Sequence, residues 1–302
     1  MDLLNRPPSP CETEGEQHIR GMKAIPWKGD VGQMKETAMR LYTKGEGQTL
    51  LFLHGLGSSH HCWSQAVEIL KSDYHCCSLD LYGHGALQTP PDLPTIETTV
   101  ATIGNLLHQV KWKPAAIVGH NLGGVIALTL ALKDPRCTQR LVLIDTPTRQ
   151  MSWRWIRTLS LTTLRKHFKK AVTKQFSRMT RDEDLSRELV QEALDTDQEA
   201  YLSYMESVLQ TDLKEQIRDI QLPVHIWMTR SLAPDFQTFN RVLSRFGYSH
   251  IPEIQRHHSP EYGHFMMMES PEAFGEMLDA MIQRQTGAQN NKPRIKHHAQ
   301  KE

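Results

Sequence analysis

Residues 115–124, which read AAIVGHNLGG, decide the fold together with the run VIALTLALKDP that follows them. AAIV has the pattern of a short buried strand, and VIALTLALK has that of a helix. The residues between them are mostly small, as a sharp turn from strand to helix requires. Such a turn exposes the side chain at its centre, so the sequence predicts that Asn121 stands at the tip of a tight bend.

Five further strand-like runs lie on either side of this stretch and alternate with helical patterns. That alternation predicts an α/β fold with a doubly wound, mostly parallel sheet. Ligands bind such sheets beyond the carboxyl ends of the strands. The runs are TLLFL at 49–53, HCCSL at 75–79, LVLI at 141–144, VHIWM at 224–228 and EIQRH at 253–257.

One long segment interrupts the alternation. Residues 148–220 contain no strand-like run and read as several helices, so we expect a helical lid over the carboxyl edge of the sheet. The lid belongs to a domain at 26–285. Residues 1–25 are polar and rich in proline and predict a disordered tail, and residues 286–302 predict a basic tail.

Composition excludes several classes of function. The 302 residues carry a formal charge of +1, so no global charge favours nucleic acid as a partner. The five cysteines are odd in number and lack zinc-ligand spacing, which indicates reduced thiols. The sequence shows neither a signal-peptide pattern nor an apolar run of the roughly 20 residues that cross a bilayer, and we expect a cytoplasmic protein.

The turn GHNLGG resembles the GHSLGG nucleophile elbow of the α/β-hydrolase fold family, of the AB hydrolase-1 type, with asparagine in place of serine. Four other segments resemble motifs of that family, and the resemblance runs from about residue 36 to residue 282. The segments are HGLG at 54–57, DLYGHG at 80–85, LVLID at 141–145, and GHF at 263–265 followed by ESPEAF at 269–274.

The resemblance implies roles for individual residues. The amides of Leu56 and Leu122 form the oxyanion hole, His264 is the catalytic histidine, and Asn121 occupies the nucleophile position. His120 occupies a structural position, and the turn at 80–85 is structural as well. No cofactor and no metal is implied.

Two positions depart from the family pattern. A carboxamide nitrogen is delocalised into its carbonyl, so Asn121 cannot be activated by histidine as a serine hydroxyl can. Where the family usually places its acid, after the strand at 224–228, the sequence has Ser231. Asp145 and Asp235 are the two candidates to replace that acid as the partner of His264.

These departures leave several functions open. The first is a degenerate, non-catalytic homologue, or pseudoenzyme. The second is an enzyme in which His264 is a general base, either in lyase or elimination chemistry or in acyl hydrolysis of unusual mechanism on a small apolar or acyl-containing ligand. The third is an esterase inactivated by one substitution. An epoxide-hydrolase or dehalogenase mechanism is disfavoured, because it needs aspartate at position 121.

Two remaining features favour ordinary structural interpretations. The pairs His60–His61 and His257–His258 lack accompanying ligands, so we interpret them as exposed loop histidines rather than a metal site. Residues 149–181 are basic with interleaved apolar residues, which suits peripheral contact with an anionic membrane or a partner. We favour the simpler interpretation, in which the apolar face covers the cleft and the acidic stretch 182–215 balances the charge.

Overall fold

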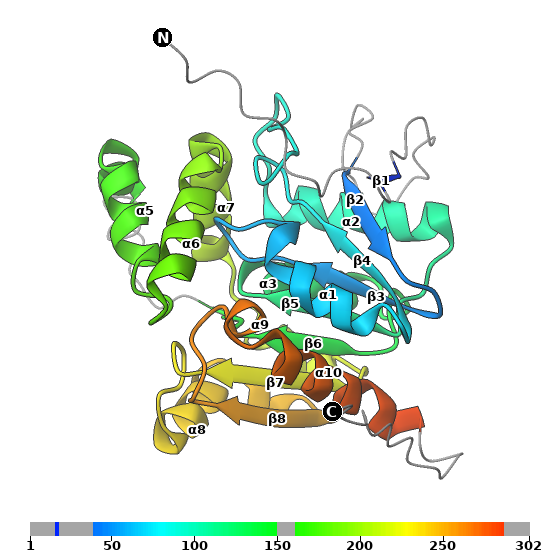
Figure 1. Cartoon of the computed structure of the whole chain (residues 1–302). Helices are drawn as coiled ribbons and strands as arrows, with labels where there is room; N and C mark the ends of the chain where they lie inside the picture. The colour runs from blue at the N-terminus through cyan, green and yellow to red at the C-terminus, as the bar shows by residue number, and fades with distance from the viewer. Residues whose placement is uncertain (1–15, 18–38, 150–160, 287–302) are drawn as a thin grey trace, which may run out of the picture.

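A computed structural model describes residues 16–17, 39–149 and 161–286 of the chain. Within these residues, eight strands form one sheet in the order β1-β2-β4-β3-β5-β6-β7-β8 (Figure 1). The strands β3 to β8 all run parallel to one another. At one edge of the sheet, β2 pairs antiparallel with β4, and β1 pairs antiparallel with β2. This confirms the doubly wound, mostly parallel sheet. The strands are β1 (Glu16–Gln17), β2 (Leu41–Lys44), β3 (Gln48–Leu53), β4 (Tyr74–Leu79), β5 (Ala116–His120), β6 (Leu141–Ile144), β7 (Val224–Thr229) and β8 (Ile254–Ser259).

Burial on both faces explains why the central strands are continuous apolar runs. All residues of β5 and β6 are buried, as parallel strands covered by helices on both sides must be. One core cluster joins the sheet to α2 (Ile96–Val110), α3 (Leu122–Lys133) and α8 (Phe236–Arg245). A second cluster joins the opposite face to α1 (Ser64–Leu70) and α10 (Pro271–Thr286).

The described part of the insertion between β6 and β7 is largely helical. It includes α5 (Phe168–Phe176), α6 (Glu183–Asp195) and α7 (Gln198–Gln210). Figure 1 shows these helices gathered beyond the end of the sheet toward which the β7 and β8 arrows point. The described part of 148–220 is therefore helical as expected, apart from an isolated bridge between Arg149 and Asp212; residues 150–160 lie outside the described chain.

The expected N-terminal tail needs a correction. Glu16 and Gln17 pair with Tyr42 and Leu41 as strand β1, so this part of residues 1–25 adds to the sheet. No sequence pattern predicts this strand, because two residues have no measurable periodicity. The strand β2 was missed as well, because LYTK is short and half polar. The rest of 1–25, and the expected basic tail beyond Thr286, lie outside the described residues.

Candidate active site

The bend at Asn121 is the tight strand-to-helix turn that the sequence predicts. Asn121 joins β5 to α3 with φ 49° and ψ −110°, a conformation that costs free energy for any residue other than glycine. Its amide donates to the carbonyl of Ile144 at 2.9 Å. A Cβ at position 119 would lie 2.5 Å from the Cα of Gly124, so the turn closes only because Gly119 has no side chain.

Helix capping does not explain why residue 121 is asparagine. Asparagine is among the preferred N-cap residues, because its side-chain oxygen accepts a hydrogen bond from an amide of the first turn. Asn121 occupies the N-cap of α3 with a positive φ, and its side chain makes no such bond. The carboxamide is therefore available at the tip of the bend.

The residues assigned to the oxyanion hole lie close to this bend. Leu122 is the first residue of α3, where an amide has no earlier helical carbonyl to bond. Leu56 follows Gly55, and a Cβ at position 55 would lie 3.3 Å from the Cβ of Asn121 and 2.9 Å from Nδ1 of His120. The HGLG loop is thus packed directly against the elbow.

His264 is paired with Asp145. Its Nδ1 lies 2.8 Å from Oδ2 of Asp145, and the two side chains are 12% and 1% exposed. A carboxylate can only accept, so Nδ1 carries the proton and the lone pair resides on Nε2. This is the arrangement of an imidazole prepared to act as a base.

Asp145 is itself held in place by a residue that sequence reasoning missed. The amide and the hydroxyl of Thr229, the last residue of β7, donate to Asp145 at 2.8 and 2.6 Å. Asp145 follows β6 with φ 43°, a second strained position beside that of Asn121. A threonine at the end of a strand carries no signal of this role in the sequence.

The second candidate acid, Asp235, lies at the start of α8. Asp235 is the N-cap of α8, where it accepts from the amide and hydroxyl of Thr238 at 2.7 and 3.0 Å. The hydrogen bond from the Thr238 amide lowers the pKa of this exposed carboxyl. Ser231, at the usual acid position, donates its amide to Thr229 Oγ1. The structure brings Asp145 to His264 and leaves Asp235 on the helix end.

This difference predicts unequal effects of Asp145→Asn and Asp235→Asn. We expect Asp145→Asn to lower any His264-dependent activity by roughly 10⁴-fold, because the Asn amide would impose the wrong imidazole tautomer. Asp235→Asn should leave that activity unchanged, since asparagine caps a helix equally well. Labelling rates of both variants, each made in an Asn121→Ser protein, measure the effect. Equal losses in the two variants would contradict the assignment.

His120 packs between the elbow and the Asp145–His264 pair. It is fully buried, and its ring centroid lies 4.4 Å from that of His264. Burial, and then the neighbouring His264, hold the pKa of His120 well below its usual range. His120 is therefore a neutral packing residue, in keeping with the structural role implied for it.

The inserted helices contact the HGLG loop and the two serines that follow it. A Cβ at Gly57, in the HGLG loop, would lie 2.6 Å from Phe176 of α5 and 3.1 Å from Tyr201 of α7. The carboxyl of Glu192 on α6 accepts from the hydroxyls of Ser58 and Ser59, and burial raises its pKa. These contacts fix the insertion to the loop that supplies the Leu56 amide.

In the described part of the basic segment 149–181, the apolar residues of α5 pack into the protein interior. Phe168, Val172 and Phe176 of α5 are buried, whereas Lys169 and Lys170 are exposed. The apolar side chains of α5 are thus not available to a membrane. Ion pairs link the basic segment to the acidic stretch, as in Arg165–Glu199 at 2.5 Å and Arg149–Asp212 at 3.2 Å.

The paired histidines are not simply exposed loop residues. His60 stacks on Tyr42 and its Nδ1 lies 2.9 Å from Asp80. His257 and His258 lie within β8, and His258 Nε2 lies 2.8 Å from the carbonyl of Ala233. Across the described residues, no group of three or more potential ligands could hold a metal ion, and no helix is long and apolar enough to span a membrane.

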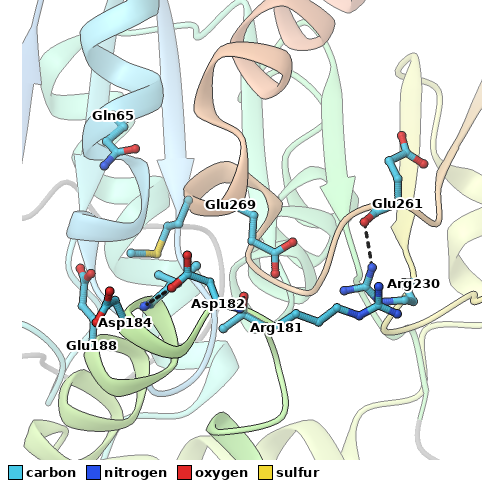
Figure 2. Close-up of a pocket in the computed structure, with 11 residues that line it drawn as sticks. Gln65, Arg181, Asp182, Asp184, Glu188, Arg230, Glu261 and Glu269 are labelled. Carbon is cyan, nitrogen blue, oxygen red and sulfur yellow. Dashed lines mark hydrogen bonds between the residues drawn. The ribbon is translucent and has the colours of Figure 1, made fainter.

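The structure also has a pocket of about 470 Å³, part of which is lined by Glu261 and Glu269 (Figure 2). It lies among the start of α6, the loop after β7 and the helix α9 (Met266–Glu269), and Asn121 and His264 do not line it. Charged side chains dominate its wall, among them Arg181, Glu188, Arg230 and Glu269. Glu269 and Glu261 connect this pocket to the loop that carries His264.

Comparisons with known proteins agree with this geometry. The chain is 26% identical over 264 residues to the pimeloyl-[acyl-carrier protein] methyl ester esterase of Nitrosomonas europaea, a match that covers 81% of the chain and 99% of that protein. It is 28% identical over 126 residues to the human serine hydrolase-like protein, covering 41% of the chain and 59% of that relative. The chain thus spans less than two thirds of the length of this human relative.

Solved structures show the same fold. An esterase from Thermogutta terrifontis superposes with a TM-score of 0.71 at 19% identity, covering 82% of the chain and 94% of the esterase. The model of the alpha/beta hydrolase family matches residues 50–277, which include both the bend at Asn121 and the Asp145–His264 pair. The chain therefore belongs to the α/β-hydrolase family.

Proposed function

We propose that this protein is an α/β-hydrolase family member without a serine-type nucleophile, in which His264 acts as a general base. The hydrogen bond between His264 and the buried Asp145 carries this proposal. It supports the His264-based alternative raised by the sequence over a merely degenerate site, because it leaves Nε2 as a proton acceptor at the carboxyl edge of the sheet. Asn121 excludes the acyl-enzyme route of a serine esterase.

Two reaction types fit such a base. In the first, Nε2 takes a proton from water, the water oxygen bonds to an acyl carbon, and the imidazolium returns the proton to the leaving group. In the second, Nε2 takes a proton from a carbon next to a carbonyl, the resulting enolate expels a leaving group as a C=C bond forms, and the imidazolium gives the proton to that group. Both need a developing oxyanion to be stabilised, which the Leu56 and Leu122 amides can do.

The ligand class follows from the same groups. Amide donors suit a carbonyl oxygen, and the Asn121 carboxamide can hold a ligand through both a donor and an acceptor. The esterase names of the relatives are consistent with an acyl-containing ligand. We therefore propose a small acyl compound as the ligand.

The first test uses the natural protein. We expect no covalent labelling by a fluorophosphonate probe, since residue 121 has no hydroxyl to phosphonylate. Any turnover of small acyl compounds should disappear in His264→Ala, as measured by product formation with purified protein. Phosphonylation detected at Asn121 by mass spectrometry, or turnover that persists in His264→Ala, would overturn the proposal.

A second candidate function is ligand binding without catalysis. The observation that favours it is Asn121 itself, because a side chain that can neither attack nor ionise stands where the family has its nucleophile. The same His264→Ala variant separates the two candidates. If the protein only binds, neither the natural protein nor His264→Ala turns over an acyl ligand, and both retain affinity for it. If the protein is a general-base enzyme, the natural protein turns the ligand over and His264→Ala does not.

A further inference from the structure

We propose that Glu269 is a positioning residue that sets the orientation of His264 by holding the peptide group before it. The proposal rests on the proposed function, in which His264 is the base. The amide of Gly263 donates to Oε2 of Glu269 at 2.6 Å, a short bond to an acidic side chain. Gly263 is the residue immediately before His264 in the chain.

Further hydrogen bonds hold the loop around this bond in place. The amide of Glu269 donates to the carbonyl of Phe265 at 2.9 Å, so α9 turns the Glu269 side chain back toward Gly263. The amide of His264, the residue after Gly263, donates at 3.2 Å to the carbonyl of Met179 in the insertion. Two successive amides are therefore fixed by groups from different parts of the fold.

Close packing at position 263 shows how tightly the loop is confined. A Cβ there would lie 2.3 Å from Oε1 of Glu269 and 2.6 Å from the carbonyl oxygen of Met179. Any residue larger than glycine would have to displace one of these groups. The close approach of the Glu269 carboxyl therefore explains why the residue before His264 is glycine.

Arg230 holds the start of the same loop. Its guanidinium donates to the carbonyl of Glu261 at 2.8 Å, and its amide donates to the carbonyl of Tyr262 at 3.0 Å. Figure 2 shows Arg230 on the Glu261 side of this loop and Glu269 closer to α6. A backbone group of each residue from Glu261 to His264 is therefore hydrogen bonded, in part by the side chains of Arg230 and Glu269, and the imidazole direction toward Asp145 follows from the chain path.

A purely space-filling role does not account for a carboxyl at position 269. Oε1 is a buried atom that makes no hydrogen bond within the described chain, and such an atom costs free energy that an apolar side chain would not. The alternative is that the negative charge favours the N-terminus of α10, which begins two residues later. The two roles differ in which variants preserve function, because one needs an acceptor and the other needs a charge.

The test compares Glu269→Gln, Glu269→Ala and a control, Glu272→Ala. Glutamine keeps an acceptor for the Gly263 amide and loses the charge, whereas alanine loses both. Glu272 is exposed in the first turn of α10, so its removal changes the charge near the helix without touching the His264 loop. The measured signal is the low-field proton resonance of His264 Nδ1–H, assigned by its disappearance in His264→Ala.

We expect the resonance to persist in Glu269→Gln and Glu272→Ala, and to be shifted or lost through exchange with water in Glu269→Ala. The corresponding proton between His60 and Asp80, 2.9 Å apart, serves as an internal control for folding and should remain in all variants. An unchanged His264 resonance in Glu269→Ala would overturn the proposal. So would equal loss in Glu269→Gln, which would make the charge the decisive property.

A second readout separates this proposal from the proposed function. In an Asn121→Ser background, Glu269→Ala should slow fluorophosphonate labelling by roughly 10- to 100-fold relative to Glu269→Gln, as misplacement of a catalytic group does. If Asn121→Ser is not labelled at all, the proposed role of His264 fails, whereas the resonance experiment still decides whether Glu269 positions the ring.

Discussion

Asn121→Ser is expected to give the protein serine-esterase activity, with turnover of p-nitrophenyl esters rising on the order of 10³-fold or more and covalent labelling by a fluorophosphonate. The backbone at position 121 already has φ 49°, so the new hydroxyl needs no change in the turn. Asp145 and His264 are hydrogen bonded at 2.8 Å, and Leu122 begins α3 beside the elbow. The missing part is a single ionisable hydroxyl.

Two controls make this result interpretable. Asn121→Ala has the smaller side chain but no hydroxyl, and should remain unlabelled. Asn121→Ser combined with His264→Ala should lose most of the gain, since a serine without its base is a weak nucleophile. Absence of labelling in a folded Asn121→Ser protein would show that the hydroxyl and His264 are not aligned, and would contradict the proposed site.

Gly123→Ala is expected to destabilise the protein by about 3 kcal/mol, at the upper end of the cost of overpacking. The added methyl would lie 2.1 Å from the carbonyl oxygen of Leu53 and 2.6 Å from that of His54. Both neighbours are backbone atoms at the end of β3, which cannot rotate away as a side chain could. The helix α3 would have to move off the sheet and carry the elbow with it.

Thermal unfolding measures this effect against a matched control. A loss of about 3 kcal/mol should lower the Tm by roughly 6–12 °C in a domain of this size. Gly275→Ala makes the same change within α10, where the new methyl meets the Ile69 side chain at 3.0 Å. Because Ile69 can adjust and alanine favours a helix, we expect Gly275→Ala to change stability by less than about 1 kcal/mol. Similar Tm values for the two variants would refute the packing argument.

Local sequence patterns determined much of the fold and part of the site. The six predicted runs correspond to β3 through β8. Buried parallel strands such as β5 and β6 are continuous apolar segments that stand out from the helices between them, whereas the edge strand β8 reads IQRHHS and is mostly polar. The bend at Asn121 was also readable, since glycines at 119, 123 and 124 allow approaches that no other residue permits. The proposal that the protein lacks serine-type chemistry rests on the identity of residue 121 alone.

The tertiary structure decided which distant groups meet. Asp145 and Asp235 were equivalent candidates in the sequence, and the pairing of β6 beside β7 placed Asp145 against Thr229 and His264 while Asp235 became a helix cap. The contacts of Glu192 with Ser58, and of Met179 with His264, join segments of different regions of the chain. Such contacts depend on the packing of whole elements, and the spacing of residues along one segment carries no record of them.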